Sequence, residues 1–512
     1  MARAKVGRKA PSPRRPAASG KIQHVVVLML ENRSFDHIFG YRAGVEGLKG
    51  TEFNLLDPTK PQSDTNPSFA VNNGAPYAVL AGNGPGHSVA DTNYQLCNDP
   101  GGPTTSLTAT NDGFARSYHD ELFQDHVPNP ASNVTAVVMQ SFAPSRLPSI
   151  NALADAFCLC DHWYAEVPGP TQPNRFYMHA ATSAGAALNN WKRQLDVPTI
   201  YNSLQNAGFT WATYSFDTNE VLEFSQVNKQ TANFKQFQAA FAADVKQGTL
   251  ANYSFIIPRF LNSKNSTHAT GGLANSQHAP QDARYGDNLV ADVYQALRSN
   301  PAIWNQSALI VIYDEHGGFY DHVVPPASGI PNPDGLNSPQ PGDPKWAPQF
   351  SFNRLGLRVP AVIASPWIKA GTVTSAQYQH TSVLATLKKM FGLKSFLTKR
   401  DASANTFETL FTQLSAPRTD TPPKLPRAPL PAATVSKNDP RHPANLPLNP
   451  DQTQMLLRVY HLTEPSQPND PPVSSLPTTQ GEAHDFIQMR YRQHFGAPGS
   501  PGVLPTRQAG KP

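Results

Sequence analysis

Short apolar runs rich in β-branched residues recur along the chain and leave few folds open to it. Residues 24–30 are HVVVLML and residues 308–313 are ALIVIY, and both runs are of strand length. Further runs lie at 253–258 and 359–365, with a shorter one at 209–215. Runs that are apolar at every position suit strands buried on both faces, as in a parallel sheet. None approaches the ~20 residues of a membrane span.

Helical patterns lie between these runs, at residues 149–157, 286–299 and 381–391. In the second pattern, Gly286 and Asp287 supply an N-cap. Its apolar residues recur at helical spacing: Leu289, Val290, Val293 and Leu297. Strands that alternate with helices predict an α/β fold, with a mostly parallel central sheet flanked by helices.

Two long segments, 41–135 and 262–285, have a different character. They are rich in Gly, Asn, Pro, Ser and Thr and show weak periodicity. Insertions of this kind in an α/β fold usually lie at the carboxyl edge of the sheet, where ligands bind. We therefore expect long loop insertions over the functional site.

The end of the chain is richer in proline than the rest. There are 50 prolines, about twice the usual ~5% share, and they are densest after residue 415. The predicted parts of the chain are a disordered basic arm (1–20), a main α/β domain (21–415), a Pro-rich linker or surface strap (416–450) and a short helical extension (451–512). The extension contains helical patterns at 451–462 and 482–495 and a disordered end.

The positive charge is concentrated at the start of the chain. The net charge is +5, and residues 1–21 hold seven basic side chains and no acid. Without these seven the remainder is near neutral. The arm is predicted to be a solubilising segment, with binding to nucleic acid or an anionic membrane as the alternative. No apolar stretch follows Arg14–Arg15, so we predict no signal peptide and, by default, a cytoplasmic location.

Three short segments carry oxygen-bearing side chains at positions suited to chemistry. Glu31 and Asn32 end the first apolar run, and Asp314 and Glu315 follow the run at 308–313. The carboxyl ends of parallel strands meet in one crevice, so these four side chains should lie together. Thr171 lies in a loop stiffened by prolines, which lowers the entropy lost when its hydroxyl reacts.

Together these groups can hold a divalent cation and activate a hydroxyl as a nucleophile. Each segment also has a plainer interpretation. The Glu31–Asn32 pair could be a solvated cap, the Asp314–Glu315 pair an exposed acidic loop, and the Thr171 segment a rigid turn. Arg175 could pair with a phosphate oxygen or brace the loop.

Histidines form a second set of candidates. His87 and His278 lie in the polar insertions expected over the site. Further candidates are His316, His322 and His380. The chain has 16 histidines, so most must be structural. The sequence contains no P-loop, dinucleotide fingerprint, Cys-x-x-Cys pair or Gly-x-Ser-x-Gly motif.

Six ordered blocks resemble a known family. They are 31-ENRSFDHIFG-40, 86-GHS-88, 112-DGF-114, 168-PGPTQPNR-175, 313-YDEHGGFYDHVVPP-326 and 379-QHTS-382. The chain is similar over residues 22–402 to the bacterial phosphoesterase family, which includes phospholipases C and an acid phosphatase. That family belongs to the alkaline-phosphatase-like superfamily, and the resemblance implies the same fold.

The resemblance also implies roles for individual residues. Glu31, Asn32, Asp314 and Glu315 would bind the metal, and Thr171 would be both nucleophile and metal ligand. His87 and His278 would contact the phosphate or the leaving group. Two departures stand out: His278 is followed by Ala279 where the family has proline, and the helices after residue 450 differ from the β-rich C-terminal domains of some phospholipases.

These observations favour a metal-dependent phosphoester hydrolase, similar to phospholipase C, that works through a phosphothreonine intermediate. Oxygen ligands favour Ca²⁺, Mg²⁺ or Mn²⁺ over Zn²⁺. The alternatives are an acid-phosphatase-type phosphomonoesterase and a non-catalytic protein that binds anionic surfaces. The expected partner is a phosphoester substrate. A phospholipid is one such substrate, and it would bring the protein into peripheral contact with a membrane. No specific nucleic acid partner is expected.

Overall fold

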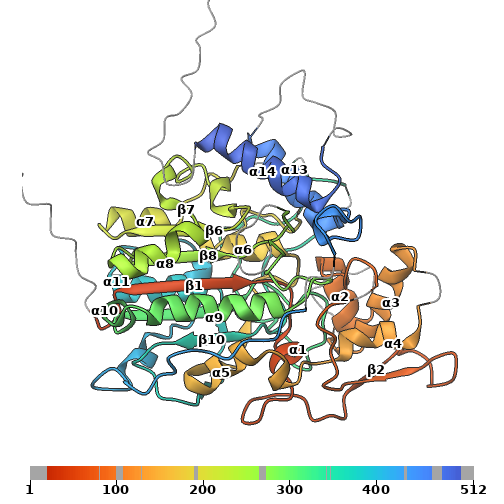
Figure 1. Cartoon of the computed structure of the whole chain (residues 1–512). Coiled ribbons are helices and arrows are strands. Elements are labelled where there is room, and N and C mark those ends of the chain that lie inside the picture. Colours follow the sequence, from red (N-terminus) through yellow and green to blue (C-terminus); the bar gives the residue numbers. More distant parts are fainter. Residues whose placement is uncertain are drawn as a thin grey trace, which may run out of the picture.

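An eight-stranded sheet runs through the middle of the molecule in the computed structural model (Figure 1). Its strand order is β11-β4-β10-β9-β1-β8-β6-β7. The strands are β1 (His24–Leu30), β4 (Cys158–Cys160), β6 (Trp211–Ser215), β7 (Phe234–Gln236), β8 (Tyr253–Ile257), β9 (Ser307–Tyr313), β10 (Ala361–Ala364) and β11 (Thr372–Thr374). The structure describes residues 20–79, 81–99, 108–127, 130–189, 194–264, 272–341, 343–345, 347–431, 435–463 and 476–496.

All five apolar runs form strands of this sheet, and the α/β prediction is confirmed. β1 lies at the centre, parallel to β8 on one side and to β9 on the other. Its residues from Val25 onward are buried because both faces of the sheet are covered. β10 runs antiparallel to β9 and β4, so the sheet is mostly rather than wholly parallel.

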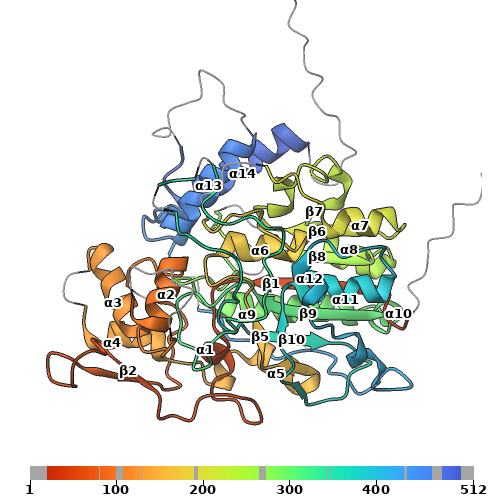
Figure 2. The same cartoon turned by 180° about the vertical axis from the view of Figure 1, so that it is seen from behind.

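Helices cover both faces of the sheet. Figure 1 shows α9 (Arg284–Arg298) across one face, and Figure 2 shows α11 (Thr381–Phe391) on the opposite face. The other helices of this layered core are α5 (Pro148–Ala156), α6 (Thr171–Ala180), α7 (Ile200–Asn206), α8 (Phe237–Gln247), α10 (Pro301–Trp304) and α12 (Lys399–Ser403).

The predicted N-cap at Gly286 and Asp287 is wrong. Helix α9 already begins at Arg284, and Asp287 lies in its buried first turn. The Asp287 carboxylate instead accepts hydrogen bonds from the backbone N–H groups of Ser149 and Ile150, at 3.0 and 2.9 Å. It therefore caps the first turn of the neighbouring helix α5, a role that local sequence does not reveal.

The insertion at 41–135 is more regular than its composition suggests. It forms β2 (Phe53–Leu55), β3 (Ser68–Ala70), α2 (Val89–Cys97), α3 (Phe114–Gln124) and α4 (Ser132–Thr135). These elements lie beyond the arrowhead of β1 in Figure 1, at the carboxyl edge of the sheet. Short helix α1 (Phe35–Phe39) connects β1 to them.

The Pro-rich segment after residue 415 follows the surface of α9. The Tyr294 hydroxyl and the Arg298 Nε both donate to the Pro422 carbonyl, at 2.7 and 3.2 Å. Asn288 Nδ2 donates to the Ala428 carbonyl at 3.0 Å. Within the described residues the segment is thus a strap held by side-chain hydrogen bonds to backbone carbonyls.

Two helices complete the chain, α13 (Pro450–Thr463) and α14 (Gln480–Phe495), which pack on each other above the sheet edge (Figure 1). Residues 1–19 of the predicted basic arm and the predicted disordered end from 497 lie outside the described residues. No helix in the described part of the chain is both long and apolar enough to cross a bilayer. The domain boundaries stay predictions.

Candidate active site

The chain leaves β1 in a sharp turn that places Glu31 and Asn32 at the carboxyl edge of the sheet. Both residues are buried. Asn32 has a φ of 58°, in the left-handed region that asparagine tolerates better than most residues. Its backbone N–H donates to Asp314 Oδ1 at 3.0 Å. Backbone strain of this kind clusters at functional sites.

Asp314 and Glu315 follow β9 directly, and the register of the sheet brings them beside the first pair. Leu30, the last residue of β1, pairs with Tyr313, the last of β9. Both carboxylates are fully buried. Within the described residues, Asp314 Oδ2 and Glu315 Oε1 make no hydrogen bond. Buried carboxylate oxygens are costly unless a partner meets them, and a cation is the natural partner.

Two glycines after Glu315 allow this loop to touch its neighbours. A Cβ on Gly317 would lie 2.2 Å from the Asn32 carbonyl oxygen. A Cβ on Gly318 would lie 2.5 Å from the Gly86 carbonyl oxygen. Both glycines have positive φ. The Gly-Gly pair therefore lets the Asp314 loop contact both the Asn32 turn and the loop that carries His87.

Thr171 is the first residue of helix α6, not part of an extended loop. Its hydroxyl is buried and donates to Asn32 Oδ1 at 3.4 Å. Asn174 holds the preceding turn, because its side chain bonds the backbone of Val167, Gly169 and Pro170. The N-terminus of a helix also favours a bound anion such as phosphate.

His87 and His278 face each other across the site, with ring centroids 5.7 Å apart. His87 Nε2 lies 3.1 Å from Asn32 Nδ2 and 3.9 Å from Glu315 Oε1. Burial lowers the pKa of an imidazole, but Glu315 and Asp451 outweigh it and raise the pKa of His87 to about 10. The pKa of His278 is also raised, against burial, by Asp451 and Glu31.

Asp451 is a residue of this site that sequence reasoning missed. It lies in the first turn of α13, and its Oδ2 is 3.4 Å from His278 Nε2 and 3.7 Å from His87 Nε2. Asn189 Nδ2 donates to the other oxygen at 2.9 Å. Burial opposes ionisation, yet the two imidazoles hold the pKa of Asp451 well below its usual range. No motif surrounds this residue that could have revealed it.

Arg175 is a bracing residue rather than a free phosphate ligand in this structure. Its Nε donates to Glu220 Oε1 at 2.9 Å, and its Nη1 lies 3.7 Å from Asp314 Oδ2. The other candidate histidines have structural partners: His316 contacts Gln95, His322 contacts Asp36, and His380 contacts the Asp314 carbonyl at 2.7 Å.

Burial and mutual repulsion raise the pKa of the site's carboxyl groups. Burial raises the pKa of Glu31 to about 7, in spite of His278 and Arg175. Burial, together with Glu31 and Glu315, raises the pKa of Asp314 well above its usual range. A positive ion bound here would relieve the repulsion and restore the carboxylates to their ionised form.

Two cavities meet at the site. The inner one, of about 40 Å³, is lined by Glu31, Thr171 and His278 among others. The outer one, of about 220 Å³, is lined by His87, Asp91 and Glu121 among others. Asn189 and Asp451 line both. Asp451 thus stands between the buried groups and the outer cavity.

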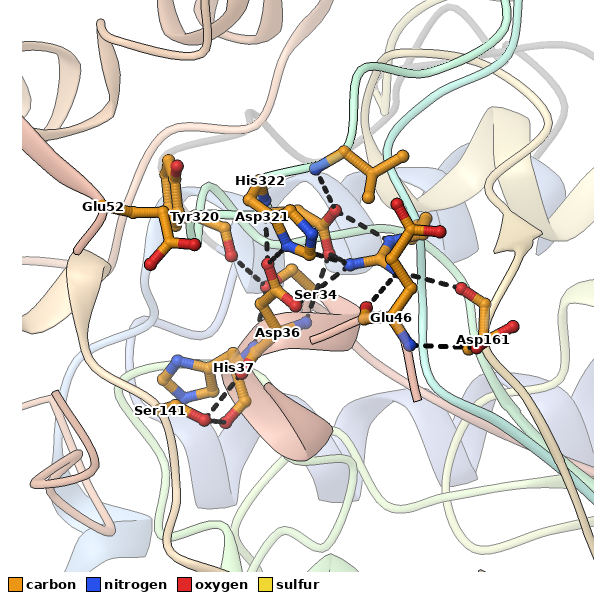
Figure 3. A network of polar contacts seen from close by, with 12 residues as sticks. Ser34, Asp36, His37, Glu46, Glu52, Ser141, Asp161, Tyr320, Asp321 and His322 are labelled. Carbon is orange, nitrogen blue, oxygen red and sulfur yellow. Dashed lines mark hydrogen bonds and ion pairs between the residues drawn. The ribbon is translucent and has the colours of Figure 1, made fainter. Parts of the chain in front are cut away.

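A buried ion-pair network anchors the loops behind the site. Figure 3 shows Asp36, Asp321 and His322 pointing toward one another. Arg358 Nε donates to Asp321 Oδ1 at 2.9 Å, and its Nη2 donates to Asp36 Oδ1 at 3.0 Å. Because Asp36 follows the Asn32 turn and Asp321 follows Glu315, this guanidinium ties together the two loops that carry the carboxylates.

The family model and the sequence relatives point to one family. The family model described as "Phosphoesterase family" matches residues 22–394. Non-specific phospholipase C3 of Arabidopsis thaliana is 37% identical over 437 residues, which cover 80% of this chain and 78% of the relative. Phospholipase C B of Mycobacterium tuberculosis is 29% identical over 470 residues, which cover 79% of this chain and 82% of the relative. A crystal structure of an alkaline phosphatase superfamily protein from Vibrio parahaemolyticus aligns at 13% identity, with a TM-score of 0.30. The alignment covers 51% of this chain and 64% of that protein.

Proposed function

Because the chain belongs to the Phosphoesterase family and is a phosphoric ester hydrolase of the phospholipase C kind, we propose that it cleaves phospholipid phosphodiesters with Thr171 as the nucleophile. The Thr171 hydroxyl attacks phosphorus, a phosphothreonine forms, and the alcohol departs. Water then hydrolyses the phosphothreonine and regenerates the hydroxyl.

A divalent metal ion fits the residues around Thr171. The supporting observation is the pair of buried carboxylate oxygens, Asp314 Oδ2 and Glu315 Oε1, that lack hydrogen-bond partners within the described residues. Glu31, Asn32, Thr171, Asp314 and Glu315 would be the ligands. When bound, the metal lowers the pKa of the threonine hydroxyl and stabilises the charge that develops on phosphorus. The all-oxygen donor set favours Ca²⁺, Mg²⁺ or Mn²⁺.

The remaining groups position the reaction. Arg175, held by Glu220, keeps the Asp314 carboxylate beside the β1 turn. His278 lines the inner cavity with Thr171, and His87 lies 3.1 Å from Asn32. Both would contact the phosphate or donate a proton to the leaving oxygen. The positive end of the α6 dipole adds stabilisation for the negative phosphoryl group, although Pro173 has no N–H and the Gln172 N–H is donated to Asn189.

Thr171→Ala tests the nucleophile. We expect turnover to fall to less than a tenth of the wild-type rate, because no other hydroxyl replaces the attacking oxygen, while the melting temperature stays unchanged. Thr171→Ser keeps the hydroxyl and should retain partial activity. Full activity in the alanine variant would exclude Thr171 as the nucleophile.

A substrate panel separates the proposed phospholipase from the alternative phosphomonoesterase. Hydrolysis of p-nitrophenyl phosphorylcholine and phosphatidylcholine should exceed hydrolysis of p-nitrophenyl phosphate. The phosphomonoesterase alternative predicts the reverse order. A protein that binds anionic surfaces without catalysis would hydrolyse none of the three.

A further inference from the structure

Three side chains from distant parts of the chain converge above the proposed metal ligands. They are His87 from the loop before α2, His278 from the insertion after β8, and Asp451 from α13. Their ligand atoms all lie within 4.8 Å of one another. Asp451 Oδ2 is 3.4 and 3.7 Å from the two Nε2 atoms. Two ligands on a tetrahedral Zn²⁺, with bonds of ~2.0–2.1 Å, are separated by about 3.4 Å.

The tautomers of both imidazoles are set by backbone carbonyls. His87 Nδ1 lies 3.0 Å from the Pro85 carbonyl oxygen, and His278 Nδ1 contacts the Ala279 carbonyl oxygen. A carbonyl oxygen can only accept, so each Nδ1 carries the hydrogen. A metal ion would displace the proton from each Nε2, which would then offer its lone pair on the side that faces Asp451. Metal-binding histidines typically donate their other ring N–H to a carbonyl or carboxylate in this way.

One of these nitrogens lacks a hydrogen bond. His278 is more than nine-tenths buried, and its Nε2 has no hydrogen-bond partner within the described residues. His87 Nε2 has one, the Asn32 amide at 3.1 Å, and this bond would give way to a metal bond. Asn189 holds the Asp451 carboxylate in place. Its Nδ2 donates to Asp451 Oδ1, and its Oδ1 accepts from the backbone N–H of Gln172, next to Thr171.

The local charge favours bound cations. Glu31, Glu220 and Asp451 line the inner cavity together with Arg458, which is paired with Glu223. Arg175 lies between Glu220 and Asp314, and Glu315 faces His87. Carboxylates therefore outnumber guanidinium groups around the two histidines, and a cation would be attracted here.

We propose that His87, His278 and Asp451 bind a second divalent cation. Two imidazole nitrogens and one carboxylate oxygen form the donor set of catalytic Zn²⁺ sites, which keep a position open for water or substrate. This donor set differs from the oxygen ligands proposed for the first ion, so the two sites prefer different metals. The outer cavity at Asp451, whose side chain is 33% exposed, provides an entry path.

The catalytic consequence of this second ion rests on the proposed function. Two ions about 3.5–4 Å apart form the clamp found in many phosphoryl-transfer enzymes. Glu315 Oε1 is 3.9 Å from His87 Nε2, so a ligand of the first set lies close to a ligand of the second. The second ion would then meet the leaving oxygen in place of a protonated histidine. Binding of the ion itself does not depend on catalysis.

Zinc retention measures the site directly. Metal-free full-length protein is loaded with Zn²⁺, desalted, and its metal content is counted by mass spectrometry. We expect the wild type to retain one more Zn²⁺ per chain than Asp451→Asn and than His278→Gln. Glu482→Gln, which changes an exposed first-turn acid on the other C-terminal helix, should match the wild type. Melting curves establish that each variant is folded.

Anomalous diffraction from zinc-loaded crystals provides an independent measurement. A peak within bonding distance of Asp451 and both imidazoles would support the proposal. Equal zinc content in wild type and Asp451→Asn, or crystals whose anomalous peaks all lie elsewhere, would overturn it. Neither measurement uses activity. A zinc-binding protein that cleaves no phosphoester would therefore refute the proposed function and leave the second site standing.

Discussion

Gly317 is the position where one methyl group should disturb the proposed active site most selectively. A Cβ added there would lie 2.2 Å from the Asn32 carbonyl oxygen and 2.8 Å from the Asn32 Cβ. Non-bonded carbon contacts are optimal at ~3.5–4.0 Å, so Asn32 or the Asp314 loop must move by about 1 Å. The Asn32 turn is in a strained left-handed conformation and buried, so it cannot move without carrying the proposed ligand with it.

The expected effect of Gly317→Ala has two parts. Alanine at a φ of 66° costs roughly 1–2 kcal/mol, and overpacking against a rigid neighbour costs a further ~1–3 kcal/mol. A displacement of about 1 Å at a reacting centre costs about 10²-fold in rate, so kcat/KM should fall by about that factor. Affinity for the divalent metal should fall as well.

Gly329→Ala is the matched control. Gly329 has a φ of 73°, and an added Cβ there meets no atom within 4 Å. It therefore carries the same conformational cost without the clash. Thermal melts and kcat/KM on a p-nitrophenyl diester are measured for both variants. The reasoning fails if Gly317→Ala melts like Gly329→Ala and retains more than a third of the wild-type kcat/KM.

Three further predictions follow from the charges. Arg358→Met should lower the free energy of unfolding by ~3–5 kcal/mol, because two buried carboxylates lose their cation. The control Arg427→Met removes an exposed ion pair and should cost under ~1 kcal/mol. Denaturant unfolding curves measure both free energies. Since the pKa of Glu31 is raised to about 7 in the folded metal-free protein, its ionisation should reduce stability as pH rises from about 4.5 to 7. The melting-temperature gain from a divalent metal should therefore be larger at pH 7.5 than at pH 5, and an unchanged gain would contradict this. Deleting residues 1–20 should leave the kinetics on soluble substrates unchanged and lower activity only on anionic vesicles at low salt. The reason is that salt screens charges beyond ~10 Å at 0.1 M. A large loss of activity on a p-nitrophenyl substrate would place the arm in the active fold.

The sequence was most informative where one physical rule dominates. Runs such as 24–30 and 308–313 suit strands covered on both faces, and the residues that follow parallel strands lie at one edge of the sheet. That rule places Glu31, Asn32, Asp314 and Glu315 together in advance of any coordinates. Thr171 and the two histidines depended on motif resemblance.

Long-range partners could not be predicted in the same way. Asp451 reaches the histidines only because α13 packs over the sheet edge, and nothing near residue 451 records that docking. Asp287 caps a helix other than its own, and Arg175 is satisfied by Glu220. Each of these pairings depends on how segments far apart in sequence come to lie side by side, which periodicity and local propensity do not encode.

The central place of β1 has a consequence for synthesis on the ribosome. The first strand of the chain is buried between β8 and β9, and its pairing residues in β9 are made about 280 residues later. At translation rates of ~5–20 residues per second, the nascent VVVLML segment waits about 15 to 60 s for its permanent neighbours. Throughout that time an apolar strand with two open edges is exposed, which makes it prone to aggregate and a natural target for chaperones.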